Sequence, residues 1–223
     1  MTNPLIVALD VGSIDEAVTL AKTIGDAAGA YKIGLELFGA AGPEAVRAID
    51  GPVFLDLKLH DIPTTVARAI AALVPLAPAM LNVHALGGAA MLRAAADATP
   101  STTKLLAVTI LTSLDDAALA ELKLPPAREA VPHLARLAAE CGCDGVVCSP
   151  ADLALVRPVV PDGFLLVTPG VRPSGADAGD QARIATPKQA IAGGATHIVV
   201  GRPITAAPDP RAAAEAIANE VRA

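Results

Sequence analysis

The chain has 223 residues, of which 53% are hydrophobic, 18% are charged and 2% are aromatic, and its formal net charge is −6. High hydrophobicity with low charge excludes an intrinsically disordered chain, and the length fits one domain, which we expect to span residues 1–223. The 17 Lys and Arg residues are scattered with almost no aromatic residues among them, so we expect no nucleic-acid partner.

A membrane segment has to be considered because the mean hydropathy is +0.51. The longest apolar stretch, Ala69–Leu92, is interrupted by two prolines, an asparagine, a histidine and a Gly-Gly pair, whereas a spanning helix needs about 20 mostly apolar residues in one rod. Met1–Pro4 contains no basic residue before its short apolar run, so no signal peptide is predicted. We therefore expect a cytoplasmic protein with no membrane partner. In that compartment we expect reduced, structural thiols at Cys141, Cys143 and Cys148.

Short β-type runs alternate with longer Ala-rich helical runs along the chain. The predicted strands are Leu5–Asp10, Ala30–Leu37, Val53–Leu59, Met80–Ala85, Leu105–Thr112, Gly145–Ser149, Leu165–Val171 and Thr196–Arg202. The predicted helices are Ile14–Ala28, Pro43–Ile49, Pro63–Leu76, Ala89–Ala98, Ala130–Cys141, Ala151–Val156, Pro187–Ala192 and Pro210–Val221. Strict alternation is typical of parallel strands with crossover helices, and eight units indicate an α/β fold of the (β/α)8 TIM-barrel type. A doubly wound open sheet is the alternative, but no Gly-rich dinucleotide or P-loop motif occurs.

Two predicted connections are long. Pro173–Gln181 is rich in Gly, Ser and Asp and follows a strand, which favours a lid over a bound ligand. We assign no function to the other, Leu114–Glu129.

The third predicted strand carries charge on one face. Alternate residues of a strand point to opposite faces, so Phe54, Asp56 and Lys58 share the face that points into the barrel. A carboxylate and an ammonium near the carboxyl end of a strand lie where barrel enzymes place catalysis. The structural alternative is a buried ion pair that fills the barrel.

Together with this strand, three others complete a set of four consecutive strands that send polar groups to one rim. Asp10 ends the first strand, Lys32 and Glu36 share a face of the second, and Asn82 and His84 share a face of the fourth. Alone, Asp10 could instead cap the helix that follows it, and His84 is expected to be a hydrogen-bonded neighbour of the site rather than a catalyst. We assign no function to Glu36.

The loops after the last two strands suggest an anion site. Many barrels bind phosphate there through backbone N–H groups and a short helix. Gly201 permits close backbone approach, Arg202 can direct two donors at a phosphate, and Arg172 follows the preceding strand. Together they predict a phosphate-bearing small molecule as substrate.

These residues form part of a longer pattern, beginning with Asp56-Leu57-Lys58-Leu59-His60-Asp61-Ile62-Pro63. That run resembles the signature of the orotidine 5′-phosphate (OMP) decarboxylase family. The resemblance covers nearly the whole chain through Ala8-Leu9-Asp10, Tyr31-Lys32-Ile33-Gly34, Leu111-Thr112-Ser113, Thr168-Pro169-Gly170-Val171-Arg172, Gly179-Asp180-Gln181-Ala182-Arg183 and Val200-Gly201-Arg202-Pro203-Ile204. One departure is Thr64, where the family commonly has Asn; we expect a tolerated change because Thr65 is retained.

The resemblance implies decarboxylation of OMP to UMP and CO₂ in pyrimidine biosynthesis, with neither a metal nor an organic cofactor. It implies that Lys32, Asp56, Lys58 and Asp61 form an alternating charged network, in which Lys58 protonates C6 of the base. It also implies a homodimer, in which Asp61, Ile62 and Thr65 serve the partner's site. The remaining implied contacts are Asp10 and Lys32 for the ribose, Thr112 for the base, and Arg172, Gln181, Gly201 and Arg202 for the phosphate.

Two other functions compete with this one. A magnesium-dependent phosphosugar decarboxylase or aldolase of the same barrel group would hold its metal with carboxylates. Lys32 stands where that group typically has a metal-binding Glu, and an ammonium there would repel Mg²⁺. A non-catalytic nucleotide-phosphate binding protein would not need the intact Asp56 and Lys58.

Overall fold

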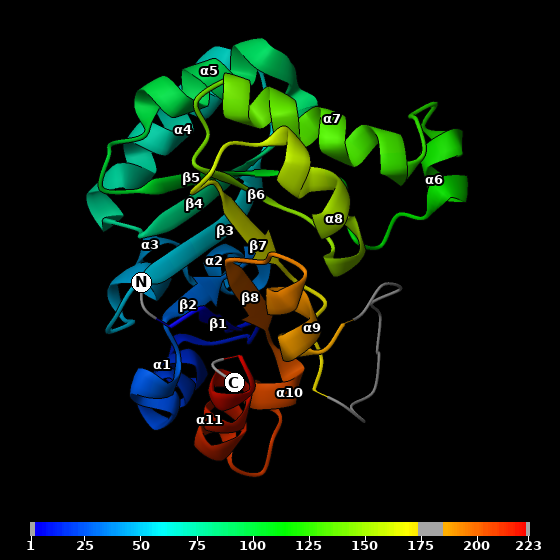
Figure 1. Cartoon of the computed structure of the whole chain (residues 1–223). Helices are drawn as coiled ribbons and strands as arrows, with labels where there is room; N and C mark the ends of the chain where they lie inside the picture. The colour runs from blue at the N-terminus through cyan, green and yellow to red at the C-terminus, as the bar shows by residue number, and fades with distance from the viewer. Residues whose placement is uncertain (1–2, 174–184, 222–223) are drawn as a thin grey trace.

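The computed structural model describes residues 3–173 and 185–221 of the chain. Its strands form a closed barrel in chain order, and every neighbouring pair, including β1 with β8, is parallel. The strands are β1 (Leu5–Ala8), β2 (Ala30–Ile33), β3 (Val53–Leu59), β4 (Met80–His84), β5 (Lys104–Val108), β6 (Gly145–Val147), β7 (Leu165–Thr168) and β8 (His197–Val200). The predicted (β/α)8 barrel is therefore confirmed (Figure 1).

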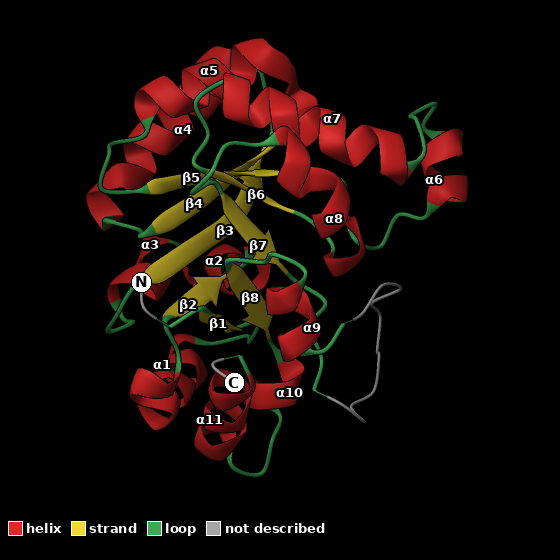
Figure 2. Cartoon of the chain, viewed as in Figure 1, coloured by secondary structure: helices red, strands yellow, loops and turns green. Residues whose placement is uncertain are grey.

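Helices surround the strands (Figure 2). The α-helices are α1 (Ile14–Ile24), α2 (Leu35–Ala41), α3 (Pro43–Arg47), α4 (Pro63–Leu73), α5 (Gly88–Ala98), α6 (Asp116–Glu121), α7 (Ala127–Glu140), α8 (Leu153–Val156), α9 (Pro187–Ala192), α10 (Arg202–Thr205) and α11 (Pro210–Glu220). Short 3₁₀ turns are η1 (Gly25–Ala27), η2 (Val74–Leu76), η3 (Ala85–Gly87), η4 (Pro150–Asp152) and η5 (Arg157–Val159).

The alternation of residues along the strands separates two apolar layers. Outward residues such as Tyr31, Val53 and Leu55 pack with the helices in the larger cluster of buried side chains. The inward residues form a smaller cluster within the barrel: Ile6, Ala8, Ala30, Phe54, Met80, Leu106, Val167 and Val199. Further along the strands, polar residues such as Lys32 and Asp56 also point into the barrel. They therefore lie between this apolar cluster and the carboxyl ends of the strands.

Several strands end earlier than the sequence predicts, and one difference changes a residue's position. The prediction that Glu36 shares a strand face with Lys32 is wrong, because β2 ends at Ile33 and Glu36 lies in the first turn of α2. The alternating apolar residues after Ile33 mimic a strand, but Leu37 is buried as part of the helix and Leu35 is 62% exposed.

The segment Leu114–Glu129, expected as a long connection, contains α6 and the start of α7. Asp115 begins α6 by accepting a hydrogen bond from the Ala118 N–H, as expected for an acidic N-cap. Figure 1 shows α6 at the far end of α7 from the barrel strands.

Other predicted features have mixed outcomes. Within residues 3–173 and 185–221, no helix combines the length and hydrophobicity needed to cross a bilayer. The three cysteines are buried thiols.

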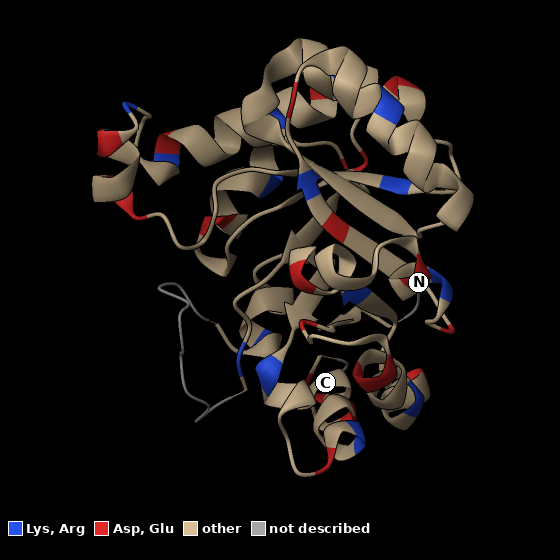
Figure 3. Ribbon diagram, turned by 180° about the vertical axis from the view of Figure 1, so that it is seen from behind, with Lys and Arg blue, Asp and Glu red and all other residues tan. Residues whose placement is uncertain are grey.

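Most of the predicted lid Pro173–Gln181, including Gln181, lies outside the described residues. Across the part of the chain that is described, Lys and Arg occur on separate elements rather than along a single face (Figure 3).

Candidate active site

A cavity of about 440 Å³ opens at the carboxyl ends of the strands. Eight of the predicted site residues line it: Asp10, Lys32, Asp56, Lys58, Thr112, Arg172, Gly201 and Arg202. They come from both halves of the chain, and the closure of the barrel between β1 and β8 brings them together. The cavity wall also contains apolar residues for which the sequence predicts no role in binding: Val108, Ile110, Leu111, Val147, Cys148 and Val199.

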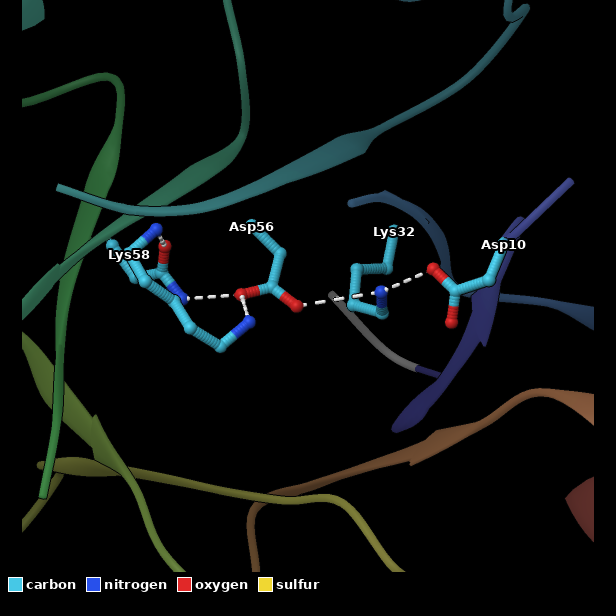
Figure 4. A network of polar contacts seen from close by, with 5 residues as sticks. Asp10, Lys32, Asp56 and Lys58 are labelled. Carbon is cyan, nitrogen blue, oxygen red and sulfur yellow. Dashed lines mark hydrogen bonds and ion pairs between the residues drawn. The ribbon is translucent and has the colours of Figure 1, made fainter. Parts of the chain in front are cut away.

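Four side chains on the first three βα units form a row of alternating charge (Figure 4). Lys32 Nζ lies 2.8 Å from Asp10 Oδ1 and 3.3 Å from Asp56 Oδ2. Lys58 Nζ lies 2.6 Å from Asp56 Oδ1. Each carboxylate is therefore in contact with an ammonium, and Asp56 lies between two of them.

Burial decides which members of this row are held most firmly. The side chains of Lys32 and Asp56 are 10% and 11% exposed, whereas those of Lys58 and Asp10 are 31% and 53% exposed. Asp10 does not cap α1, because Ser13 accepts the capping hydrogen bond from the Glu16 N–H. The row therefore has a buried centre and two more exposed ends.

The electrostatics follow from this burial. Desolvation would raise the pKa of Asp56, but the neighbouring Lys32 and Lys58 outweigh it and the pKa lies below the ordinary value. Desolvation would likewise lower the pKa of Lys32, but Asp56 and Asp10 hold that pKa above its ordinary value. Both groups are thus charged at neutral pH, although each would resist ionisation in such a buried place if it were alone.

Asn82, which the sequence analysis placed on an inward face without a role, connects to the centre of the row. Its side-chain amide donates to Asp56 Oδ1 at 2.7 Å, and its carbonyl oxygen accepts from the Lys58 backbone N–H at 2.7 Å. The signal in the sequence was the inward position of Asn82, but its partners depend on how β3 and β4 align.

His84 differs from its expected setting. Its ring stacks on His60 with the centroids 5.5 Å apart, and among the described residues its buried Nδ1 has no hydrogen-bond partner. Burial, the neighbouring His60 and Lys58 together lower the pKa of His84. The expectation of a hydrogen-bonded His84 is thus wrong for this nitrogen, and the contact that the ring does make is the stacking on His60.

Three of the predicted phosphate residues, Arg172, Gly201 and Arg202, line the same cavity as this row. Arg172 is 8% exposed, and its backbone N–H donates to the Ala185 carbonyl at 2.9 Å, which anchors the chain after β7. Arg202 is exposed at the start of α10, directly after Gly201. The cavity is therefore lined by two arginines as well as by the lysine–carboxylate row.

Three predicted residues do not reach the cavity of their own chain. Asp61, Ile62 and Thr65 are exposed in the loop after β3 and the first turn of α4, and none lines the cavity. Asp61 Oδ1 accepts a hydrogen bond from the Ile62 N–H at 2.6 Å. The fourth member of the alternating row within one chain is consequently Asp10, and not Asp61.

A parallel eight-stranded barrel with such a charged cavity at its carboxyl end defines the chain as a (β/α)8-barrel enzyme. Residues 3–217 match the family model described as "Orotidine 5'-phosphate decarboxylase / HUMPS family". The chain belongs to that family.

Individual proteins agree with this assignment. The chain is 52% identical to an orotidine 5′-phosphate decarboxylase from Thermobifida fusca, with 100% of this chain and 97% of the relative covered. It is 53% identical to one from Anaeromyxobacter sp., with 95% of each covered. The crystal structure of orotidine 5′-phosphate decarboxylase from Lactobacillus acidophilus superposes with a TM-score of 0.87 at 41% identity, covering 99% of this chain and 100% of that one.

Proposed function

We propose that this chain, as one catalytic domain, decarboxylates OMP to UMP and CO₂, without a metal ion and with Lys58 as the proton donor to C6. In the cell this would be the final step of UMP synthesis. The observation that carries the proposal is the Asp10–Lys32–Asp56–Lys58 row, which shares a cavity with Arg172 and Arg202. The names of the relatives support the choice of OMP as substrate.

Lys58 has the position and the exposure that the chemistry needs. Loss of CO₂ leaves an electron pair on C6, and a fixed ammonium stabilises that negative charge as it develops. The same ammonium then transfers a proton to C6 and becomes a neutral amine, which solvent reprotonates. Lys58 Nζ is held by Asp56 at 2.6 Å but its side chain is 31% exposed to the cavity, so a substrate can reach it.

Asp56 supplies a second contribution by repelling the substrate carboxylate. Two unit charges 4 Å apart at an effective dielectric constant of about 20 interact by about 4 kcal/mol. The repulsion disappears as neutral CO₂ leaves, so it raises the energy of the bound substrate relative to the transition state. Asp56 can do this only while ionised, and the lowered pKa that Lys32 and Lys58 impose on it keeps it so.

Binding energy from the phosphate offsets this repulsion. Contacts remote from the reacting carbon can hold the substrate in a position it would otherwise avoid. Arg172 and Arg202 line the same cavity as the lysine–carboxylate row and are the groups we assign to the phosphate, and Thr112, which also lines the cavity, is assigned to the base. We assign Asp10 and Lys32 to the ribose hydroxyls, and Gln181 and Gly201 to the phosphate.

The proposed reaction is tested by mixing the purified protein with OMP and following the loss of ring absorbance. We expect turnover at the same rate before and after treatment with EDTA, because Lys32 Nζ lies between Asp10 and Asp56 and opposes a divalent cation there. A strict requirement for Mg²⁺ would favour the phosphosugar-type chemistry instead. Binding of UMP with no turnover of OMP would indicate a non-catalytic nucleotide-binding protein.

We also propose that the enzyme is a homodimer in which Asp61, Ile62 and Thr65 complete the partner's site. All three are exposed, and Ile62 is 67% exposed although it is a large apolar residue. Leu35 and Leu86, which follow β2 and β4, are 62% and 39% exposed. Large apolar side chains exposed after three consecutive strands favour a protein contact at this rim.

Replacement of Arg202 by alanine tests the phosphate end of the cavity. We expect KM for OMP to rise about 10- to 100-fold, because a charge-assisted hydrogen bond to phosphate is lost. The kcat should fall less, since Arg202 does not touch the reacting carbon. Steady-state kinetics measure both values, and Arg136→Ala, which removes an exposed arginine from α7, is the matched control. An unchanged KM in Arg202→Ala would remove this residue from the phosphate site.

A further inference from the structure

The backbone of Lys58 has an unusual conformation for a non-glycine residue. Its φ is +51°, in the left-handed region, although it lies within β3. The pairing of β3 with β4 shifts register between Leu55 and Leu59, so Lys58 lies in the irregular part of the strand. Non-glycine residues avoid this region unless the surrounding structure holds them there, and such positions cluster at active sites.

The side chain of Asn82 on β4 stabilises this conformation by a hydrogen bond to the Lys58 backbone. Asn82 is 1% exposed, and its Oδ1 accepts the Lys58 backbone N–H at 2.7 Å. The register shift removes Lys58 from regular pairing, and this contact gives its N–H a partner. The left-handed backbone of Lys58 is thereby tied to the neighbouring strand.

The other half of the same amide acts on the carboxylate that contacts Lys58. Asn82 Nδ2 donates to Asp56 Oδ1 at 2.7 Å, and Lys58 Nζ reaches the same oxygen at 2.6 Å. A donor must face the carboxylate and an acceptor must face the N–H, so a side-chain amide satisfies both with one orientation. An ionised carboxylate cannot reproduce this pair of contacts, because it has no donor.

We propose that Asn82 is a positioning residue for the decarboxylation, which fixes the Lys58 backbone and the Asp56 carboxylate relative to each other. This inference rests on the proposed function, because it assigns Asn82 a role through Lys58 and Asp56. Asn82 itself does not line the cavity and is not expected to touch the substrate.

Kinetics of Asn82→Ala test the role in catalysis. We expect kcat for OMP to fall about 100-fold, because displacement of a catalytic group by about 1 Å has effects of this size, while the affinity for UMP stays unchanged. Thr103→Val is the matched control: Thr103 is equally buried and its hydroxyl donates to the Pro78 carbonyl at 2.8 Å, but it lies at the amino end of β5. It should lose stability and keep kcat. Equal kcat in Asn82→Ala and wild type would overturn the proposal.

A pH profile of Asn82→Asp separates positioning from folding. The new carboxylate would still accept from the Lys58 N–H but would repel Asp56. Protonation of the new carboxyl restores a donor to Asp56, so kcat relative to wild type should recover as the pH falls. The charged groups next to Asp56 are the ammoniums of Lys32 and Lys58. The His84 ring, which stacks on His60, also interacts electrostatically with Lys58. A ratio that does not change with pH would contradict the proposed donor role.

A crystal structure of Asn82→Ala separates this proposal from the proposed function. Lys58 should leave the left-handed region, and its Nζ should move away from the Asp56 carboxylate. This result does not depend on whether the wild-type protein converts OMP. If Lys58 keeps its backbone conformation and its contact with Asp56 in the variant, Asn82 does not position it, whatever the activity.

Discussion

Replacement of Lys58 by alanine is expected to lower kcat for OMP by at least about 10⁴-fold, since both a proton donor and the charge that stabilises the developing carbanion are lost. Lys58 Nζ is the cavity-facing ammonium that ends the alternating row. The neighbouring Lys32 cannot replace it, because its ammonium is buried between Asp10 and Asp56. Single-turnover assays at high enzyme concentration would measure the residual rate.

The binding of UMP provides the control for this variant. Arg172 and Arg202 remain in Lys58→Ala, so we expect the affinity for UMP to change far less than kcat. Lys104→Ala is the matched substitution, because Lys104 also forms an ion pair, with Asp144 at 2.7 Å, but lies at the amino end of β5. It should keep its activity. Near-normal kcat in Lys58→Ala would show that the assigned mechanism is wrong.

Mixing two inactive variants is expected to restore activity if the site is shared between subunits. In a hybrid dimer of Lys58→Ala and Asp61→Ala chains, one site has both defects and the other has neither. Random reassociation should therefore give about a quarter of the wild-type activity, as two-fold symmetry requires. The exposure of Asp61 and its absence from the cavity of its own chain motivate this experiment.

The control for complementation uses two variants of one chain's cavity. Lys58 and Asp56 belong to the same cavity, so a mixture of Lys58→Ala and Asp56→Ala should stay inactive in every dimer. Activity in this control would mean that the mixing procedure itself restores turnover. No activity in the Lys58→Ala and Asp61→Ala mixture, with hybrid dimers demonstrated by native mass spectrometry, would contradict the shared site.

The arrangement of the lysine–carboxylate row could be predicted from sequence because strand alternation is a strong physical constraint. Phe54, Asp56 and Lys58 had to share a face, and burial of Phe54 in the barrel interior determines which face that is. The same alternation put Lys32 on one face of its strand, and the structure has Ala30, two residues earlier, in the barrel interior. It failed for Glu36, because the alternating pattern continues beyond Gly34 where the chain has already turned into α2.

The remaining features depend on contacts between elements. The left-handed backbone of Lys58 and the two hydrogen bonds of Asn82 arise from a local register shift between β3 and β4. No periodicity in either strand indicates such a shift. The proposed roles of Asp61 and Ile62 involve a second chain, because both residues are exposed and neither lines the cavity of its own chain.

The proposed metal-free decarboxylation is tested most directly by the reaction of the EDTA-treated protein with OMP in D₂O, with the products followed by NMR. We expect one CO₂ and one UMP for each OMP, with deuterium at C6, because the Lys58 ammonium exchanges its protons with solvent before it donates one. Unchanged OMP, or UMP that forms only after a divalent metal ion is added, would contradict it.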